Sequence, residues 1–273
     1  MKSIATLILN RNLPKVTDKL YMSIKKNEGH LTDIFVIEAG SSKNNLSKYT
    51  TWYANSKSVK RNGLRFPRGM NYGLYNLWKE NLFHKYDAFF LITNDTVIKD
   101  KKTLLKLYRI IKNNEKIGIL APTSKNWGEN RLIGRNSFKF SWYIHNHAYF
   151  LNKEFLIKII NTDGGYQNFL FDGSNFRGYG LESELIAKAY ANNFAAAITN
   201  KVFVEENEDY LLKYDDLIKT DSYSKNLNLY YKEGLKWMKK KYGFNNKWLL
   251  QNYVKLFYDD FFVNFPKYKK YKI

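Results

Sequence analysis

The first half of the chain alternates short apolar runs with amphipathic segments, and this alternation constrains the fold more than any other feature. Short apolar runs bounded by polar residues are typical of buried strands, and they occupy residues 4–9, 33–42, 88–92 and 117–122. Apolar residues at helical spacing fill the intervening segments 16–26, 70–82 and 101–114. Strands that alternate with crossover helices form a mostly parallel sheet with helices on both faces. The sequence therefore predicts an α/β, Rossmann-type fold with a mixed, mostly parallel sheet.

The pattern becomes less regular after residue 125. Residues 137–160 predict one or two strands followed by a helix, and a further helix at 181–192 precedes a closing strand at 195–206. Residues 246–265 have the spacing of an amphipathic helix. Residues 234–273 hold ten lysines against two acidic residues, interleaved with aromatic side chains. We therefore expect a catalytic-type α/β domain at 1–209 and a basic, aromatic, helical extension at 210–273.

The positive charge of the chain limits the classes of partner that it attracts. Lys and Arg number 45 against 25 Asp and Glu, which gives a formal net charge of +20. Such a protein attracts nucleic acid, anionic lipid or phosphorylated small molecules, and no recognisable nucleic-acid-binding motif selects the first of these. The chain has no cysteine, which excludes disulfides and favours a reducing cytoplasm. No apolar run reaches the roughly 18 residues of a membrane span.

Polar residues follow the predicted strands at their carboxyl ends. Glu38 and Gly40 end the second strand, and Asp95 and Thr96 follow the strand at 88–92. In an open α/β sheet the ligand crevice lies outside the carboxyl ends of the strands, so these residues are candidates for a binding site. The alternative is that Asp95 caps a turn, as Asp often does.

Five segments that occur in a fixed order carry a resemblance to a known family. They are LNRNLP (9–14), VIEAGSS (36–42), RGMNYGL (68–74), FFLITNDT (89–96) and GYGLESEL (178–185). Together they resemble the GT-A-fold glycosyltransferases of the broad family 2 type, over roughly residues 3–206. The resemblance implies an inverting transfer of a sugar from a nucleotide-diphosphate donor to a hydroxyl of a bacterial cell-surface glycan precursor, such as capsule or lipooligosaccharide.

The resemblance also implies a donor site. Asn10, Arg11 and Glu38 would contact the base and ribose of the nucleotide. Arg68 and Asn71, near the start of a predicted helix, would approach the diphosphate, which the amino end of a helix also favours.

The metal motif of the family is incomplete in this chain. Thr93 stands where the first acid of Asp-x-Asp is usual, which leaves Asn94 and Asp95 as donor-site residues. A carboxylate about 4 Å from a phosphate charge costs on the order of 4 kcal/mol at an effective dielectric of 20. Asp95 would therefore face the diphosphate through Mg²⁺ or Mn²⁺, whose other ligands would be phosphate and water.

The segment GYGLESEL is similar to the part of the family that supplies the catalytic base. Glu182 and Glu184 are both candidates, but residues two apart do not share a helix face. Glu182 is preferred because it lies at the helix start, where the helix dipole favours an anion. The alternative is that both are solvated acids of a first helical turn.

Other features leave alternatives open. His145 and His147 would face the same side of a strand and either bind a metal or acceptor or lie on the surface. Glu205 and Glu206 stand where relatives often carry a histidine. The basic tail would place a cytoplasmic enzyme on the anionic inner face of the cell membrane, close to a lipid-linked acceptor. The competing functions are a nucleic-acid- or polyanion-binding protein and, because of Thr93, a catalytically inactive GT-A scaffold.

Overall fold

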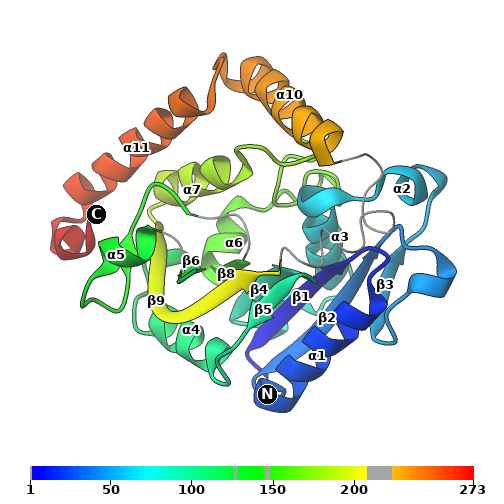
Figure 1. The fold of residues 1–273 in the computed structure, drawn as a ribbon. Helices are drawn as coiled ribbons and strands as arrows, with labels where there is room; N and C mark the ends of the chain where they lie inside the picture. Colours follow the sequence, from blue (N-terminus) through cyan, green and yellow to red (C-terminus); the bar gives the residue numbers. More distant parts are fainter. Residues whose placement is uncertain (1, 126–127, 145–147, 208–222) are drawn as a thin grey trace.

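The computed structural model describes residues 2–125, 128–144, 148–207 and 223–273 (Figure 1). Within these ranges nine strands form one sheet in the order β3-β2-β1-β4-β8-β6-β9-β5, with β7 also paired to β9. The strands are β1 (Ile4–Asn10), β2 (Thr32–Ala39), β3 (Thr50–Ala54), β4 (Ala88–Thr93), β5 (Thr96–Ile98), β6 (Ile117–Thr123), β7 (Lys139–Phe140), β8 (Ala148–Asn152) and β9 (Ala195–Glu206).

The sheet is mixed, as the sequence predicted. β1 pairs in parallel with β2 and β4, β2 with β3, and β6 with β9. β8 lies antiparallel between β4 and β6, while β5 and β7 pair antiparallel to β9. Every residue of β1 and β6 is buried, which explains why these strands appear in the sequence as almost continuous apolar runs.

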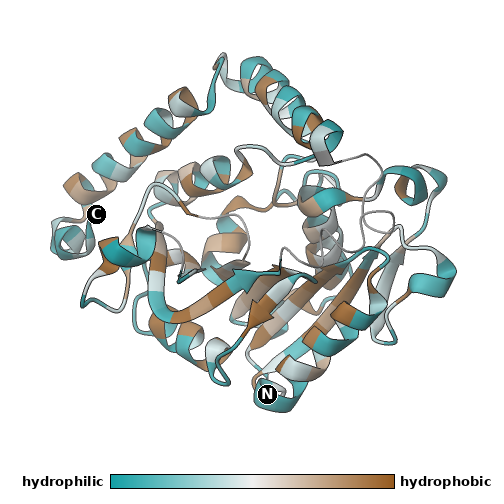
Figure 2. Ribbon diagram, viewed as in Figure 1, coloured by the Kyte–Doolittle hydropathy of each residue, from teal (hydrophilic) through white to brown (hydrophobic). Residues whose placement is uncertain are grey.

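Helices cover both faces of the sheet (Figure 1). They are α1 (Pro14–Glu28), α2 (Lys57–Asn62), α3 (Arg65–Lys79), α4 (Thr103–Lys112), α5 (Glu129–Ile133), α6 (Lys153–Ile159), α7 (Leu181–Ala191), α10 (Tyr223–Tyr242) and α11 (Lys247–Asn264), with short 3-10 turns at η1 (Lys43–Asn45), η2 (Phe83–Lys85) and η3 (Pro266–Tyr271). Figure 2 shows hydrophobic strands at the centre and hydrophilic outer faces on the helices. Among the described residues, no helix combines the length and apolar character that crossing a bilayer requires.

Two glycines let α3 lie directly on the sheet. A Cβ on Gly69 would stand 2.4 Å from Leu9 Cδ1, and a Cβ on Gly73 would stand 2.3 Å from Ile37 Cδ1. A Cβ at either position would have to displace these buried side chains, so glycine suits the close approach of α3 to β1 and β2. The close packing fixes the first turns of α3 beside the carboxyl ends of those strands.

The C-terminal helices pack onto α7. The amphipathic helix predicted at 246–265 is confirmed as α11, whose residues Tyr258, Phe261 and Phe262 are almost completely buried in the main core. α10 and α11 run one after the other along the outer side of α7 (Figure 1). The predicted boundary at 209/210 falls within residues 208–222, outside the described ranges, so the division into two domains stays a prediction.

Candidate active site

Three strands bring the first group of predicted site residues to one edge of the sheet. Asn10 at the end of β1 pairs in register with Glu38 of β2, and Leu9 pairs with Thr93 of β4. The backbone amide of Asn94 donates to the carbonyl of Leu9 at 3.1 Å. The parallel register therefore places the ends of β1, β2 and β4 side by side, as the α/β pattern predicted.

Glu38 is completely buried at this edge, and protein donors surround its carboxylate. Asn10 Nδ2 donates to both oxygens at 2.9 Å, Ser41 Oγ lies at 2.5 Å, the Ser47 amide at 2.8 Å and Thr50 Oγ1 at 3.2 Å. These bonds tie the segment after β2 to the end of β1. Glu38 thus positions the loop, and the predicted contact with a nucleotide would require some of these bonds to be exchanged.

Asn10 links Glu38 to the strand that carries the metal-motif remnant. Its side-chain oxygen accepts a hydrogen bond from Asn94 Nδ2 at 2.7 Å. Asn94 in turn lies beside the Thr17 hydroxyl of α1, at 3.4 Å. The predicted residues Asn10, Glu38 and Asn94 therefore form one connected polar network.

Asn71 is also completely buried, and it holds the segment that leads to α7. Its Nδ2 donates to the carbonyls of Gln167 (3.1 Å) and Phe171 (2.8 Å). Its Oδ1 accepts from the amides of Leu170 (3.0 Å) and Phe171 (2.8 Å). A side chain with all its hydrogen-bonding groups engaged in this way organises the site rather than contacting a ligand directly.

Two predicted arginines lie at a cavity beside α2: Arg68 lines it, and Arg11 lies against Gly63, another residue of its lining. Arg68 Nε donates to the Gly173 carbonyl at 2.8 Å, its guanidinium lies 4.9 Å from the Phe176 ring centroid, and it lines a cavity of about 320 Å³. Arg11 Nη2 donates to the carbonyls of Lys60 and Arg61 at 3.1 and 3.3 Å. Burial lowers the pKa of Arg11, although a guanidinium stays charged at neutral pH. This cation pair suits an anionic ligand such as a diphosphate.

Asp95 lies beyond the end of β4 and lines a different cavity from that of Arg68. The Thr93 hydroxyl donates a hydrogen bond to its Oδ1. Burial raises the pKa of Asp95, and the bond from Thr93 partly opposes that rise. Asp95 lines a separate cavity of about 190 Å³ between α1 and β5.

The residues around Asp95 fit a metal only in part. No group of three or more His, Cys, Asp or Glu side chains gathers within the described ranges. Asp95 therefore fits a divalent cation only if donor phosphates and water complete the coordination shell, a mode that Mg²⁺ tolerates.

Glu182 is the second residue of α7. The helix follows Gly180, which other residues cannot easily replace. Gly180 has φ +79°, and a Cβ there would lie 3.2 Å from Leu250 Cδ2 of α11. The Glu182 residue is 2% exposed, and Lys247 Nζ lies 2.5 Å from its Oε1. Its Oε2 has no hydrogen-bond partner within the described part of the chain. Since buried oxygens are normally satisfied, an orphan oxygen marks a place where a ligand donor can bind.

Glu184 has a different environment. It is 3% exposed and accepts hydrogen bonds from Lys241 Nζ at 2.5 Å and Tyr242 Oη at 2.9 Å, both on α10. Lys241 also pairs with Asp172 at 2.7 Å. The two acids thus point to different partners, and neither is a solvated acid of the first turn. Glu184 anchors α10, so Glu182 is the better candidate for a catalytic base.

The structure does not gather all three predicted carboxylates into one cavity. Glu38 is enclosed by its donors, Asp95 faces α1 and β5, and Glu182 faces α11. His145 and His147 lie outside the described residues. Glu205 accepts from Ser124 Oγ at 2.5 Å and therefore belongs to the join between β6 and β9.

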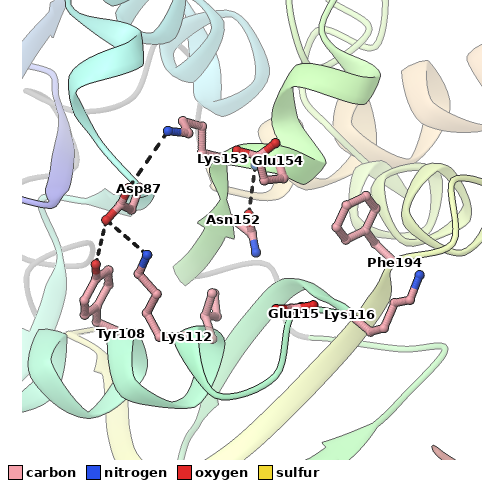
Figure 3. A pocket seen from close by; sticks show the side chains of 10 residues that line it. Asp87, Tyr108, Lys112, Glu115, Lys116, Asn152, Lys153, Glu154 and Phe194 are labelled. Atoms are coloured by element: carbon pink, nitrogen blue, oxygen red, sulfur yellow. Dashed lines mark hydrogen bonds and ion pairs between the residues drawn. The ribbon is translucent and has the colours of Figure 1, made fainter.

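A further cavity, of about 620 Å³, lies at the opposite edge of the sheet and is already neutralised (Figure 3). Asp87, which precedes β4, accepts from Tyr108 Oη at 2.6 Å and pairs with Lys112 at 3.4 Å and Lys153 at 3.9 Å. Burial opposes ionisation of Asp87, but these partners outweigh it and lower the pKa of the carboxyl. Because the Asp87 carboxylate is already paired within the protein, we place no site here.

The parallel unit β3-β2-β1-β4, the antiparallel β8 and the polar edge together define a GT-A-like α/β fold. The fold predicted from the sequence resemblance is thereby confirmed. No protein-family model and no curated protein sequence matches the chain.

Solved structures of glycosyltransferases are similar to the chain. A mannosyltransferase from Pyrobaculum calidifontis, in complex with GDP-Man and Mn²⁺, has a TM-score of 0.51 and 9% identity over 85% of this chain. The chain spans 64% of the length of that protein. A glucosyl-3-phosphoglycerate synthase from Mycobacterium tuberculosis, in complex with Mn²⁺, UDP and phosphoglyceric acid, has a TM-score of 0.47 and 14% identity, and the match covers 75% of this chain and 70% of that one. At these identities the likeness describes the fold alone.

Proposed function

We propose that the protein transfers a sugar from a nucleotide-diphosphate donor to a hydroxyl of an acceptor glycan, with inversion at the anomeric carbon. The observation that carries the proposal is the buried Glu182 carboxylate with its orphan Oε2. Glu182 acts on the pKa of Tyr149, which burial raises first and the carboxylate raises further. Tyr149 adjoins Ala148, which pairs with Ile92 near the carboxyl end of β4, the edge of the sheet at which we propose that the donor binds.

The proposed reaction gives a role to each of four charged residues. Glu182 takes the proton of the acceptor hydroxyl as its oxygen forms a bond to the anomeric carbon. The bond from that carbon to the diphosphate breaks, and its electron pair leaves with the nucleoside diphosphate. Arg11 and Arg68 offset the charge of the leaving group. Asp95 would hold a divalent cation, and that cation would supply further neutralisation of the donor phosphates.

The acceptor that we propose is a cell-surface glycan precursor at an anionic membrane. Leu256 and Val263 of α11 are 65% and 73% exposed, in a region with ten lysines against two acids over residues 234–273. Exposed apolar residues among lysines suit the interface of an anionic bilayer. Sedimentation with vesicles tests this membrane association directly. Binding should require anionic lipid and should weaken as salt is added. Binding to vesicles made of neutral lipid alone would contradict the proposal.

A thermal-shift screen tests the donor class. Nucleoside diphosphates and nucleotide sugars should raise the melting temperature, because a ligand at a hundred times its Kd stabilises by about 2.7 kcal/mol. For wild type we expect a larger shift with Mn²⁺, and for Asp95→Asn the Mn²⁺-dependent part should vanish. Without ligand this variant should melt no lower than wild type, because burial disfavours the charged form of Asp95.

Two outcomes of the screen would contradict the proposal. A shift with RNA oligomers but with no nucleotide sugar would favour a polyanion-binding protein. An equal Mn²⁺ effect in wild type and Asp95→Asn would remove Asp95 from the donor site.

A further inference from the structure

A cavity of about 780 Å³ opens beside Glu182 and differs in character from the arginine-flanked donor cavity. Its lining combines aromatic rings with a few polar groups, and includes two charged side chains, Lys247 and Glu129, besides Trp142, Tyr143, Tyr179 and Gln251. Aromatic rings with a few convergent polar groups are typical of small-molecule sites. This cavity is therefore a candidate for the second substrate of the transfer.

Lys247 separates this cavity from the carboxylate. Its Nζ lies 2.5 Å from Glu182 Oε1, 5.2 Å from the Tyr179 ring centroid and 5.7 Å from the Tyr143 ring centroid. The Lys247 side chain is 23% exposed, whereas that of Glu182 is only 3% exposed. An acceptor hydroxyl therefore reaches Glu182 only when the ammonium moves aside.

The place of Lys247 in its helix breaks a local rule. Lys247 is the first residue of α11, after the cap Asn246, whose side chain accepts from the Leu249 amide at 3.0 Å. The positive end of the helix dipole disfavours a cation at this position. The nearby Glu182 offsets the penalty: burial lowers the pKa of Lys247, but the carboxylate outweighs burial and leaves that pKa raised. Such exceptions to local preference are typical of functional positions.

The ion pair also occupies one oxygen of the base. While Lys247 stays in place, Glu182 Oε1 is engaged by the ammonium and is not open to the acceptor hydroxyl. If the Lys247 ammonium moved away from Glu182 without finding a new partner, two poorly solvated charges would be left unpaired, which is unfavourable. An acceptor that carries its own anionic group provides the ammonium with a new partner, and a neutral sugar does not.

From this arrangement we propose that the cavity is the acceptor subsite and selects a sugar with an anionic group, carboxylate or phosphate, to which Lys247 moves from Glu182. The inference rests on the proposed transfer reaction and names its acceptor class. Trp142 and Trp248 supply aromatic surfaces for the sugar ring. Exchange of the ammonium then frees Glu182 Oε1 and opens the path from the cavity to the carboxylate for the acceptor hydroxyl.

Tryptophan fluorescence of the full chain, without donor, tests the subsite. The probes are a tetrasaccharide that ends in glucuronic acid against maltotetraose, and glucose 6-phosphate against glucose, so that the carboxylate and phosphate arms are read separately. Wild type should bind at least one acidic probe tenfold or more tightly than its neutral partner. Lys247→Gln should abolish that ratio, and Lys247→Arg should keep most of it.

Lys158→Gln is the matched control. Lys158 is an exposed lysine in the last turn of α6 and does not line the cavity, so this variant loses the same charge outside the proposed subsite. It should keep the wild-type ratio. An equal loss in Lys247→Gln and Lys158→Gln, or equal affinity of wild type for acidic and neutral probes, would overturn the inference, because the net charge alone would then explain binding.

Turnover separates this inference from the proposed function. If wild type prefers acidic probes but consumes no nucleotide sugar in their presence, the proposed transfer reaction is wrong, whereas the proposed acidic-sugar site is supported. If wild type glycosylates neutral and acidic acceptors with equal kcat/KM, the proposed transfer reaction is supported and the proposed selection of acidic acceptors is wrong.

Discussion

Glu182→Gln should lower the rate of sugar transfer by about 10²–10⁴-fold, the usual contribution of a general base. Glutamine keeps the size of the side chain but cannot take a proton from the acceptor hydroxyl. Because Glu182 lies away from the arginine-flanked cavity, the variant should still bind nucleoside diphosphate with wild-type affinity. Steady-state turnover and calorimetric titration of the nucleotide measure the two quantities.

The matched control is Glu154→Gln, which changes an exposed acid in the first turn of α6. Its turnover should equal that of wild type. Full activity in Glu182→Gln would remove Glu182 from the reaction. Loss of activity with donor binding retained would exclude the inactive-scaffold alternative, since a scaffold has no turnover to lose.

Asn71→Ala should lower the free energy of unfolding by about 3 kcal/mol. The change removes four hydrogen bonds and leaves two carbonyls and two amides of residues 167–171 without their partner. An unsatisfied buried group costs about 1–3 kcal/mol, and local relaxation recovers part of the sum. Urea denaturation measures the effect.

Asn76→Ala in the same helix provides the comparison. Asn76 Nδ2 makes a single side-chain bond, to the Tyr72 carbonyl one turn earlier at 2.8 Å. Its loss should cost less than about 1 kcal/mol, within the range for one ordinary hydrogen bond. Equal effects at positions 71 and 76 would mean that Asn71 does not hold the 167–171 segment.

The strands with continuous burial were predictable from the sequence because their apolar runs are unbroken. β3 and β5 were not predicted, and each has a physical reason. β3 (Thr50–Ala54) is an edge strand with only Ala54 buried, and β5 (Thr96–Ile98) is three residues long and is defined by pairing with the distant β9. α3 begins at Arg65 rather than at the predicted residue 70, because its first turn is fixed by packing on the sheet.

Asn10, Glu38 and Asn94 lie together at one edge of the sheet, but the sequence did not reveal what each side chain binds. Glu38 and Asn71 resemble ligand residues in sequence and turn out to be enclosed by protein partners, and those of Asn71 lie 96–100 positions away. Lys247 was not identified as a site residue. The available signal was a lysine directly after a capping asparagine, where the helix dipole disfavours it.

Release of nucleoside diphosphate from a panel of nucleotide sugars, with acidic and neutral acceptors present, tests the central claim most directly. We expect wild type to release nucleoside diphosphate from at least one donor only when an acceptor is present. In Glu182→Gln the rate of this release should be lower by about 10²-fold or more. Absence of release from every nucleotide sugar, in a folded protein supplied with Mg²⁺ and Mn²⁺, would contradict it.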